Sequence, residues 1–479
     1  MNRNYFYNLL LSVVNILFPI ITFPYASHII GPDGIGKVQH AIFFAESFAL
    51  FAALGIPLYG ISAIAKSDSN TKRSKTFSEL ILIHGITGFI FSLVYFILIY
   101  TVPFFQAHLS LYSTAGLIIL LGFTSVDWFY SGLAKFKLIA LRSVFIKIIS
   151  VVLLFIFVKS PSDFLNYLCI LIFSLVGNNI ISLILIKKHT RLRIKGIKIK
   201  RHLRPVLFVL GSNIAINMYA IWDTLLLGFL TNDKTVGLYF AAVKLVKFSI
   251  PFIISLGASI IPSLTLNIHN KNKGEVDRLL AESFQFIIFL AIPIAMGTFA
   301  LAREFILVLS GNDFLSAVST MQVVAILPLF IGLGHFFSLQ ILVPSGLNRQ
   351  MFYATFAGVV CSLILNFTLI PFYGSIGSAT ANIVSEFVVT GLFYYYVNKN
   401  FDIQINWALV IKAFVSCMLF IPIVYLVRYF FQSPIAILVL SGSICASVYL
   451  LFQRIIFKNQ FLIKVSNQLI LKFKNFAVR

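Results

Sequence analysis

Charged residues are scarce in this chain. Only 11% of its 479 residues are Asp, Glu, Lys or Arg, while 59% are hydrophobic, and an ordinary soluble domain has about 25% charged residues. A soluble globular fold is therefore excluded. The sequence predicts an all-α protein that crosses a membrane many times, because lipid-exposed backbone must satisfy its own hydrogen bonds and barrel strands would alternate in polarity.

Acidic residues are the scarcest charged class. The chain has 15 Asp and Glu against 37 Lys and Arg, which gives a net charge of +22. Such a charge can indicate nucleic-acid binding, but this would need a solvated folded domain, and no segment outside the apolar runs is long enough to form one. No nucleic-acid partner is expected, and membrane topology accounts better for the positive charge.

Cysteine is also rare, and no two cysteines are spaced as in a known disulfide or metal-binding motif. The four cysteines lie singly inside apolar runs, which predicts neither a disulfide framework nor a metal site. A phosphate-binding G-x-x-x-x-G-K-[ST] motif does not occur, so ATP hydrolysis is not expected. The glycine-rich segment 31–36 joins two apolar runs, which is typical of a turn. We expect no catalytic residue and no cofactor.

Long apolar runs are what the chain does contain. Fourteen are long enough to cross a hydrocarbon core of about 30 Å. They cover about residues 8–30, 38–65, 77–100, 112–133, 142–158, 164–186, 205–230, 236–268, 279–302, 317–343, 351–371, 376–397, 406–427 and 434–456. The first run carries two prolines and no small-residue cleavage site, so it is predicted to be a retained span and not a signal peptide.

The most polar passage separates the sixth run from the seventh. Residues 186–204, IKKHTRLRIKGIKIKRHLR, hold nine Lys and Arg and no acid. Across the chain, 28 basic residues fall in the connections on the linker's side and five on the other. The excess of basic residues on cytoplasmic loops predicts that this linker and both termini are cytoplasmic. We expect the linker to set topology and to tether two moving bundles.

The two halves share a repeat. At an offset near 201, Gly36 matches Gly237, and Glu79 matches Glu282 at an offset of 203. Each half therefore carries six spans, and an even number gives the halves the same orientation. The predicted domains are a first bundle (1–186), the linker (187–204), a second bundle (205–397), two added spans (398–456) and an amphipathic tail on the inner membrane surface (457–479).

Three segments resemble a known family. They are FPYASHIIGPDGIG with a following ALGIP, then DWFYSGLAKFK, and WDTLLLGFLTNDKTVGLYFAAVKL. In order and spacing they resemble the bacterial polysaccharide flippases called Wzx. These proteins belong to an exporter superfamily that also includes the lipid II flippase and the MATE drug exporters. The resemblance covers essentially the whole chain.

The resemblance implies a transport function and a location. The chain would move undecaprenyl-diphosphate-linked repeat units of O-antigen, or of a similar surface polysaccharide, from the cytoplasmic to the outer leaflet of the inner membrane. It would do so by alternating access, through a central cleft between two six-helix bundles. Its expected partners are the lipid-linked oligosaccharide, membrane lipids, a polysaccharide polymerase and a chain-length regulator, with H⁺ or Na⁺ as a coupling ion.

Two other functions stay open at this point. One is cation-coupled export of small organic molecules, as in MATE exporters. The number of spans and a basic pair in the eighth run disfavour it, since cationic drugs would select acidic clefts. The other is a membrane glycosyl polymerase or ligase. Its acceptor chemistry would be expected to need a sizeable external loop, and the predicted external connections are about a dozen residues at most.

Ionisable residues inside the runs are the candidate site residues, because charges in a membrane usually mark function. Lys244 and Lys247 are three apart and so share a helical face; we expect them to bind the diphosphate. Asp223 and Glu46 lie at similar depth and would pair with these lysines when the cleft is empty, as gating residues. A permanent ion pair between the same spans is the equally weighted structural alternative.

Six further residues have structural or mixed interpretations. His335 and Glu386 lie near mid-span, where they could titrate in a coupling step or form a satisfied polar pair. Asp127 and Trp128 are expected at the membrane interface. The pair Thr76 and Glu79 predicts a capping box at the start of the third span.

Overall fold

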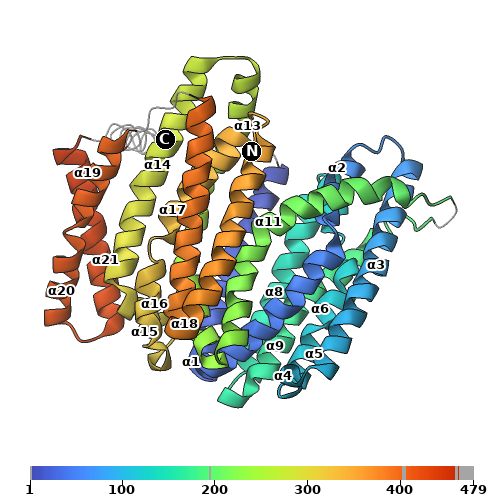
Figure 1. The fold of residues 1–479 in the computed structure, drawn as a ribbon, viewed down its shortest axis with the longest axis horizontal. Helices are drawn as coiled ribbons and strands as arrows, with labels where there is room; N and C mark the ends of the chain where they lie inside the picture. Colours follow the sequence, from blue (N-terminus) through green and yellow to red (C-terminus); the bar gives the residue numbers. More distant parts are fainter. Residues whose placement is uncertain (1–2, 194–195, 402–405, 459–461, 463–479) are drawn as a thin grey trace, which may run out of the picture. The chain divides into compact units, whose positions relative to one another are not determined.

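The fold of this chain is entirely helical. The computed structural model describes residues 3–193, 196–401, 406–458 and 462, and within these ranges every regular element is a helix (Figure 1). The predicted all-α class is therefore confirmed. The chain divides into two compact units, Met1–Phe240 and Ala241–Arg479. The division into bundles on either side of the linker stays a prediction.

The first unit contains long helices connected by short ones. In order they are α1 (Arg3–Ala53), α2 (Ile56–Ala65), α3 (Asn70–Thr101), α4 (Pro103–Gln106), α5 (Leu109–Ala115), α6 (Leu117–Leu120), η1 (Gly122–Thr124), α7 (Asp127–Gly132), α8 (Phe136–Phe157), η2 (Pro161–Asp163), α9 (Phe164–Ile172), η3 (Phe173–Gly177), α10 (Asn178–Ile186) and α11 (Lys200–Leu230). Helix α12 (Asp233–Lys247) runs from this unit into the second.

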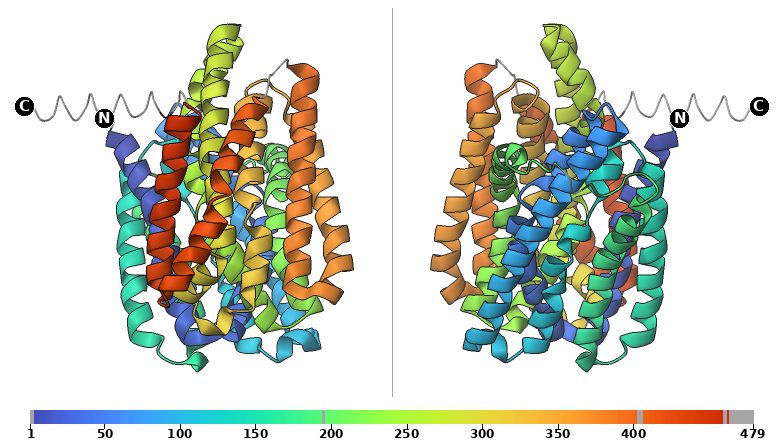
Figure 2. Two further views of the ribbon diagram at one scale, coloured as in Figure 1. Left: turned by 90° about the vertical axis from the view of Figure 1, so that its left-hand side faces the viewer. Right: turned by 90° about the vertical axis from the view of Figure 1, so that its right-hand side faces the viewer.

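The second unit has the same character. Its helices are α13 (Ile250–His269), α14 (Lys273–Ala300), α15 (Ala302–Leu309), η4 (Asn312–Phe314), α16 (Ala317–Val324), α17 (Leu327–His335), η5 (Phe336–Leu342), α18 (Asn348–Asn400), α19 (Trp407–Cys417), α20 (Phe420–Phe430), α21 (Pro434–Leu451) and η6 (Phe452–Ile456). The predicted amphipathic tail lies almost wholly outside the described residues. The α13–α14 hairpin projects beyond the ends of α19, α20 and α21 (Figure 2).

Eleven helical segments are long and apolar enough to cross a membrane, by length and composition. Two of them, Leu10–Ala65 and Asn348–Asn400, exceed 50 residues. Each contains one glycine with non-helical dihedral angles, Gly31 in the first and Gly374 in the second. When each is divided at its glycine and α11 is added, the segments correspond to the fourteen predicted spans. The predicted number of spans is thus roughly matched.

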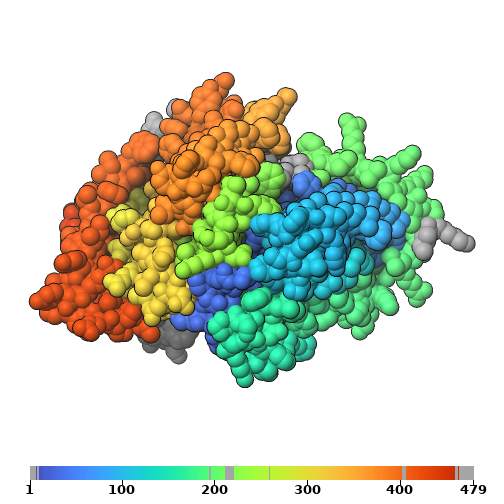
Figure 3. Space-filling model, turned by 60° about the horizontal axis from the view of Figure 1, so that its bottom comes forward, coloured from blue at the N-terminus to red at the C-terminus, as the bar shows by residue number. Residues whose placement is uncertain are grey.

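The break in α1 falls in the predicted glycine-rich turn. Gly31 has φ 72° and ψ 176°, a region of positive φ that side chains with a Cβ rarely adopt. Pro32 follows directly and cannot donate a backbone hydrogen bond back into the preceding helix. The two arms of α1 therefore meet at a sharp bend, with α5 packed against the helix. In Figure 3 the light-blue segment that includes α4 and α5 lies beside the darker blue of α1.

A buried aromatic cluster lies where α2, α3 and α7 meet in the first unit. Trp128 is only 4% exposed, and its ring centroid lies 5.8 Å from that of Phe77. Gly60 provides the space, because a Cβ at that position would lie 2.5 Å from the nearest atom of the indole ring. Trp128 is therefore a core residue of the bundle, and its expected depth at the membrane interface stays a prediction. The small Gly60 surface lets the indole pack inside the bundle, where it contributes to the core.

Asp127 has a structural role beside this cluster. Its carboxylate accepts from the Arg142 guanidinium at 2.7 Å and from the Ser182 hydroxyl at 2.9 Å. Arg142, which is 6% exposed, also donates to Asn178 at 2.8 Å. The network joins α7, α8 and α10. Arg142 is buried while the Asp127 side chain is 33% exposed, so loss of one partner should cost less than the about 3–5 kcal/mol of a fully buried pair. Asp127 thus stabilises the unit.

A similar ion pair holds α20, which is part of one of the two added spans, in the second unit. Glu304 in α15 is 3% exposed and accepts two hydrogen bonds from Arg428 in α20, at 2.7 and 2.8 Å. Arg428 also donates to the carbonyl of Ala300 at 2.9 Å. The Tyr449 hydroxyl of α21 donates to the Phe289 carbonyl of α14 at 2.9 Å. These polar contacts hold α20 and α21 against α14 and α15.

Gly36 and Gly237, which the repeat aligns, pack directly against each other. A Cβ on Gly36 would overlap the Asp233 carbonyl oxygen, and a Cβ on Gly237 would overlap the Pro32 carbonyl oxygen. At the offset of 201, Pro32 corresponds to Asp233 as Gly36 does to Gly237. Each glycine thus contacts the residue that the repeat aligns with the other glycine's neighbour: Gly36 contacts Asp233, and Gly237 contacts Pro32. This symmetry supports the alignment of the two halves at this point.

We expect this glycine contact to tolerate no side chain. Each of Gly36→Ala and Gly237→Ala should lower the free energy of unfolding by about 1–3 kcal/mol, because overpacking forces the backbones apart. The measurement is thermal unfolding of the purified protein in detergent. Gly297→Ala in α14 is the control, since no atom lies within 4 Å of its Cβ position, and it should not destabilise. An equal loss in all three variants would contradict the close-contact explanation.

Candidate functional site

The predicted eighth span is interrupted. Helix α12 ends at Lys247 and α13 begins at Ile250. The Ser249 amide donates to the Val246 carbonyl at 3.2 Å, which tightens the last turn. Proline occupies the first turn of α13, where its missing N–H costs nothing. The apolar segment Asp233–His269 thus contains a two-residue turn within a candidate membrane span. Ser249 keeps right-handed helical dihedral angles there (φ −79°, ψ −23°), and the Phe248 amide still donates to the Lys244 carbonyl.

Lys244 and Lys247 occupy the last turn of α12, at this break. Both are half-buried. Positive side chains are favourable at a helix C-terminus because they complement the partial negative charge there. Irregular turns within membrane helices are common at the substrate and ion sites of transporters. The sequence predicted the shared face of the lysines but not the break, because the apolar pattern continues through it.

The two predicted gating acids belong to the first unit. Asp223 in α11 is fully buried, and the Tyr239 hydroxyl donates to its carboxylate at 3.4 Å. Glu46 is half-buried in the second arm of α1. Lys244 and Lys247 lie in the second unit. The pairing of the acids with these lysines, whether transient or permanent, therefore stays a prediction.

His335 and Glu386 lie in the second unit. His335 ends α17, and the Gln340 amide lies 3.5 Å from its Nδ1. Gln340 is fully buried, and its Oε1 has no hydrogen-bond partner among the described residues. Gly257 makes room for this amide, since a Cβ there would overlap it. Glu386 in α18 is 6% exposed. The structure brings His335 to Gln340, and a coupling role for His335 and Glu386 stays a prediction.

The most extensive charged network was not predicted. Glu79, in α3, is fully buried. Its carboxylate accepts from the Lys198 amide at 2.7 Å, from His202 Nε2 at 2.9 Å, and from Arg201, whose Nε lies at 3.1 Å and whose terminal nitrogen forms an ion pair. The end of the basic linker and the start of α11 are thus fixed to α3 through one carboxylate.

This network corrects the prediction for Thr76 and Glu79. The N-terminus of α3 lies earlier, where the Ser69 hydroxyl accepts from the Lys72 amide at 3.2 Å. Glu79 is therefore mid-helix and cannot cap it, so the capping-box interpretation was wrong. One sequence signal could have indicated the role of Glu79. It is a single acid in an apolar span, a buried carboxylate needs a positive partner, and the linker supplies nine basic residues.

The linker also contacts α3 at two other points. The Thr190 hydroxyl donates to the Ser74 hydroxyl at 2.8 Å, and the Arg193 amide donates to the Ser78 hydroxyl at 2.8 Å. Ser74 and Ser78 are one helical turn apart and lie on the same face. The described part of the linker is therefore docked along α3 and does not form a slack tether.

His202 lies between the Glu79 carboxylate and the Tyr59 hydroxyl. Its Nε2 faces Glu79, and its Nδ1 lies 2.8 Å from the Tyr59 hydroxyl. The Nε of Arg201 also lies 3.2 Å from His202 Nε2, so this nitrogen faces both a donor and the carboxylate. Burial lowers the pKa of His202 below its ordinary value of 6.5, and the neighbouring Arg201 lowers it further, against the opposing effect of Glu79.

We expect Glu79→Gln to release the linker. The neutral amide would lose the ion pair with Arg201, whose side chain is 47% exposed. The loss should therefore stay below the about 3–5 kcal/mol of a fully buried pair, and trypsin should cut the linker faster than in the unchanged protein. Limited proteolysis and thermal unfolding measure both effects. Glu282→Gln is the matched control, because the repeat-related Glu282 pairs with Arg278 on the exposed surface of α14, where an ion pair contributes about 1 kcal/mol or less. Similar losses in both variants would contradict the proposed anchor.

The linker contact should also weaken in acid. Because the folded-state pKa of His202 lies below its ordinary value of 6.5, the unfolded chain binds the proton more readily, and stability falls as pH drops below about 6.5. His189 contributes in the same direction, since burial and Lys135 lower its pKa. His202→Gln should give a flatter dependence of melting temperature on pH between about 7.5 and 5.5. An unchanged dependence would exclude His202 as the titrating group.

The sequence is similar to that of a known protein family and of two transporters. Residues 1–267 match the model of a family described as "Polysaccharide biosynthesis protein". The chain is 24% identical over 411 residues to a putative O-antigen transporter of Shigella dysenteriae, which covers 81% of this chain and 98% of that protein. It is 23% identical over 410 residues to a putative O-antigen transporter of Escherichia coli (strain K12), with 84% and 97% covered.

Solved structures share the fold. A lipid II flippase MurJ in an inward closed conformation superimposes with a TM-score of 0.63, at 15% identity, covering 93% of this chain and 99% of that chain. An inward-facing MATE family multidrug transporter also gives a TM-score of 0.63, at 13% identity, with 80% and 93% covered. These likenesses confirm the predicted transporter fold. Because the family model matches more than half of the sequence, this chain belongs to the polysaccharide biosynthesis protein family.

Proposed function

We propose that the chain flips undecaprenyl-diphosphate-linked oligosaccharide repeat units from the cytoplasmic to the outer leaflet of the inner membrane. Its family and the names of its relatives, putative O-antigen transporters that it matches over nearly their whole length, support this class of substrate. The structural observation that carries the proposal is the position of Lys244 and Lys247 in the last turn of α12, directly before the two-residue turn that leads into α13.

The chemistry of the substrate requires such a place. Sugars and a diphosphate cannot enter hydrocarbon cheaply, because each polar group without a partner costs several kcal/mol. The polyprenyl tail can stay in the lipid. The protein must therefore supply positive charge for the diphosphate and polar surface for the sugars while the tail remains outside. Two cations at an interrupted helix are the kind of group that meets the first requirement.

Alternating access follows from competition for these cations. With substrate bound, Lys244 and Lys247 hold the diphosphate. When the site is empty, Glu46 and Asp223 take its place, and the transporter resets with its charges paired. Tyr239 donates to Asp223 and so orients this carboxylate. His335 and Glu386 are the candidates for taking up H⁺ or for acting with Na⁺ in the coupling step.

The setting proposed for this reaction is the bacterial cytoplasmic membrane. The excess of Lys and Arg on one side of the spans supports cytoplasmic termini and a cytoplasmic linker. A repeat unit delivered to the outer leaflet would pass to a polysaccharide polymerase, whose product length a chain-length regulator would set. These two proteins are the partners that we propose.

We expect the double substitution Lys244→Ala and Lys247→Ala to lower transport by at least about tenfold, because two charge contacts of more than 1 kcal/mol each are lost from the translocated state. The measurement is the appearance of repeat units on the outer leaflet and of surface polysaccharide, at matched protein levels. Lys234→Ala is the control, since Lys234 is exposed on the same helix and should be neutral.

Two results would contradict this proposal. One is normal surface polysaccharide in the double variant at normal protein levels, which would remove the lysines from the headgroup site. The other is normal turnover of lipid-linked repeat units in a deletion strain that becomes sensitive to cationic drugs. That outcome would instead identify the chain as an exporter of small organic molecules.

A further inference from the structure

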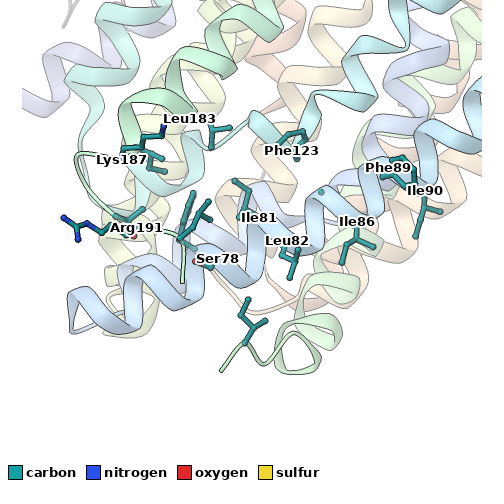
Figure 4. A pocket seen from close by; sticks show the side chains of 16 residues that line it. Ser78, Ile81, Leu82, Ile86, Phe89, Ile90, Phe123, Leu183, Lys187 and Arg191 are labelled. Atoms are coloured by element: carbon teal, nitrogen blue, oxygen red, sulfur yellow. The ribbon is translucent and has the colours of Figure 1, made fainter. Parts of the chain in front are cut away.

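A groove of about 980 Å³ lies on the first unit, between α3, α10 and the docked linker. Its walls are almost wholly apolar: Leu82, Ile86, Phe89 and Ile90 of α3 line it and are 40–63% exposed. Lys187 and Arg191 lie at one end of the groove, and Phe89 and Ile90 lie at the other (Figure 4). Its volume is at the upper end of the range of small-molecule sites, about 300–1,000 Å³.

The linker contacts described above form the groove. Ser78 and Thr190 are two polar residues in its wall, and both hydroxyls are already engaged, with the Arg193 amide and with Ser74. The wall therefore offers no uncommitted hydroxyl to a sugar. No acidic residue is present among the described residues that line it. What remains is an apolar channel with two positive charges at one end.

We propose that this groove binds an anionic phospholipid of the inner leaflet, with an acyl chain along α3 and its phosphate at Lys187 and Arg191. The charge arrangement complements such a lipid, and each basic residue near an anionic membrane surface adds a favourable contribution. The charge distribution of the chain puts this end of α3 on the cytoplasmic side, where anionic headgroups are found. The bound lipid would brace the linker in its docked position. The site does not depend on the proposed transport activity.

The experiment uses the full chain in detergent with two probes of equal acyl chains, phosphatidylglycerol and phosphatidylcholine. Native mass spectrometry counts the bound lipids, and thermal unfolding reports stabilisation. The unchanged protein should retain phosphatidylglycerol in preference to phosphatidylcholine. Substituting both Lys187→Ala and Arg191→Ala should reduce that preference roughly thirtyfold, as expected for two basic residues. The control substitutes Lys188→Ala and Lys200→Ala, two exposed linker cations outside the groove, and should keep the preference.

A second variant tests the apolar part. Gly85 lines the groove, and no atom lies within 4 Å of its Cβ position. A side chain can therefore start there, and Gly85→Phe should fill the channel and abolish retention of both lipids. Gly297→Phe, at an equally open helical glycine outside the groove, should retain them. Equal binding of both lipids to the unchanged protein, or equal losses in variants and controls, would overturn the proposal. Displacement of phosphatidylglycerol by undecaprenyl phosphate would also overturn it, since the groove would then hold the substrate's tail.

Discussion

A charge surrounded by apolar residues must find an opposite charge or a set of hydrogen-bond donors, because its desolvation otherwise costs several kcal/mol. In this chain that requirement decides which segments are joined. Glu79 holds the linker on α3, Asp127 joins α7 to α8 and α10, and Glu304 holds α20. With only 15 acids in 479 residues, such contacts are few, so each one has a large share in fixing the arrangement of otherwise similar apolar helices.

Glycine determines where these helices bend and how closely they approach. In lipid, the hydrophobic effect gives little preference for one helix contact over another, so close backbone packing and polar contacts supply the specificity. Gly31 and Gly374 break long helices, while Gly36 and Gly237 bring two backbones together. The reciprocal contact of Gly36 and Gly237 also shows the internal repeat in the structure, because residues that the sequence alignment pairs are in contact there.

The sequence predicted those features that depend on composition along the chain. Hydropathy located the spans, the glycine-rich segment located the bend at Gly31, and spacing put Lys244 and Lys247 on one helix turn. The partners of Glu79 could not be predicted this way, since Lys198, Arg201 and His202 lie about 120 residues farther along. The break after Lys247 was missed for another reason: hydropathy does not change there. Trp128 was expected at the interface from its position near a span end, and its burial beside Gly60 was not predicted.

The docked linker changes how a transport cycle would have to work in this chain. A slack connection between α10 and α11 could absorb relative movement of two bundles. Here Thr190, Arg193 and Lys198 are each bonded to α3, so α3, α10 and the start of α11 would move together. Flexing of the chain would then need to occur outside this docked region, at positions such as Gly31 in α1 or the turn between α12 and α13. The two-residue turn between α12 and α13 lies directly after Lys247. Binding of the headgroup to the proposed lysines would therefore act next to a turn at which the backbone can change its angle.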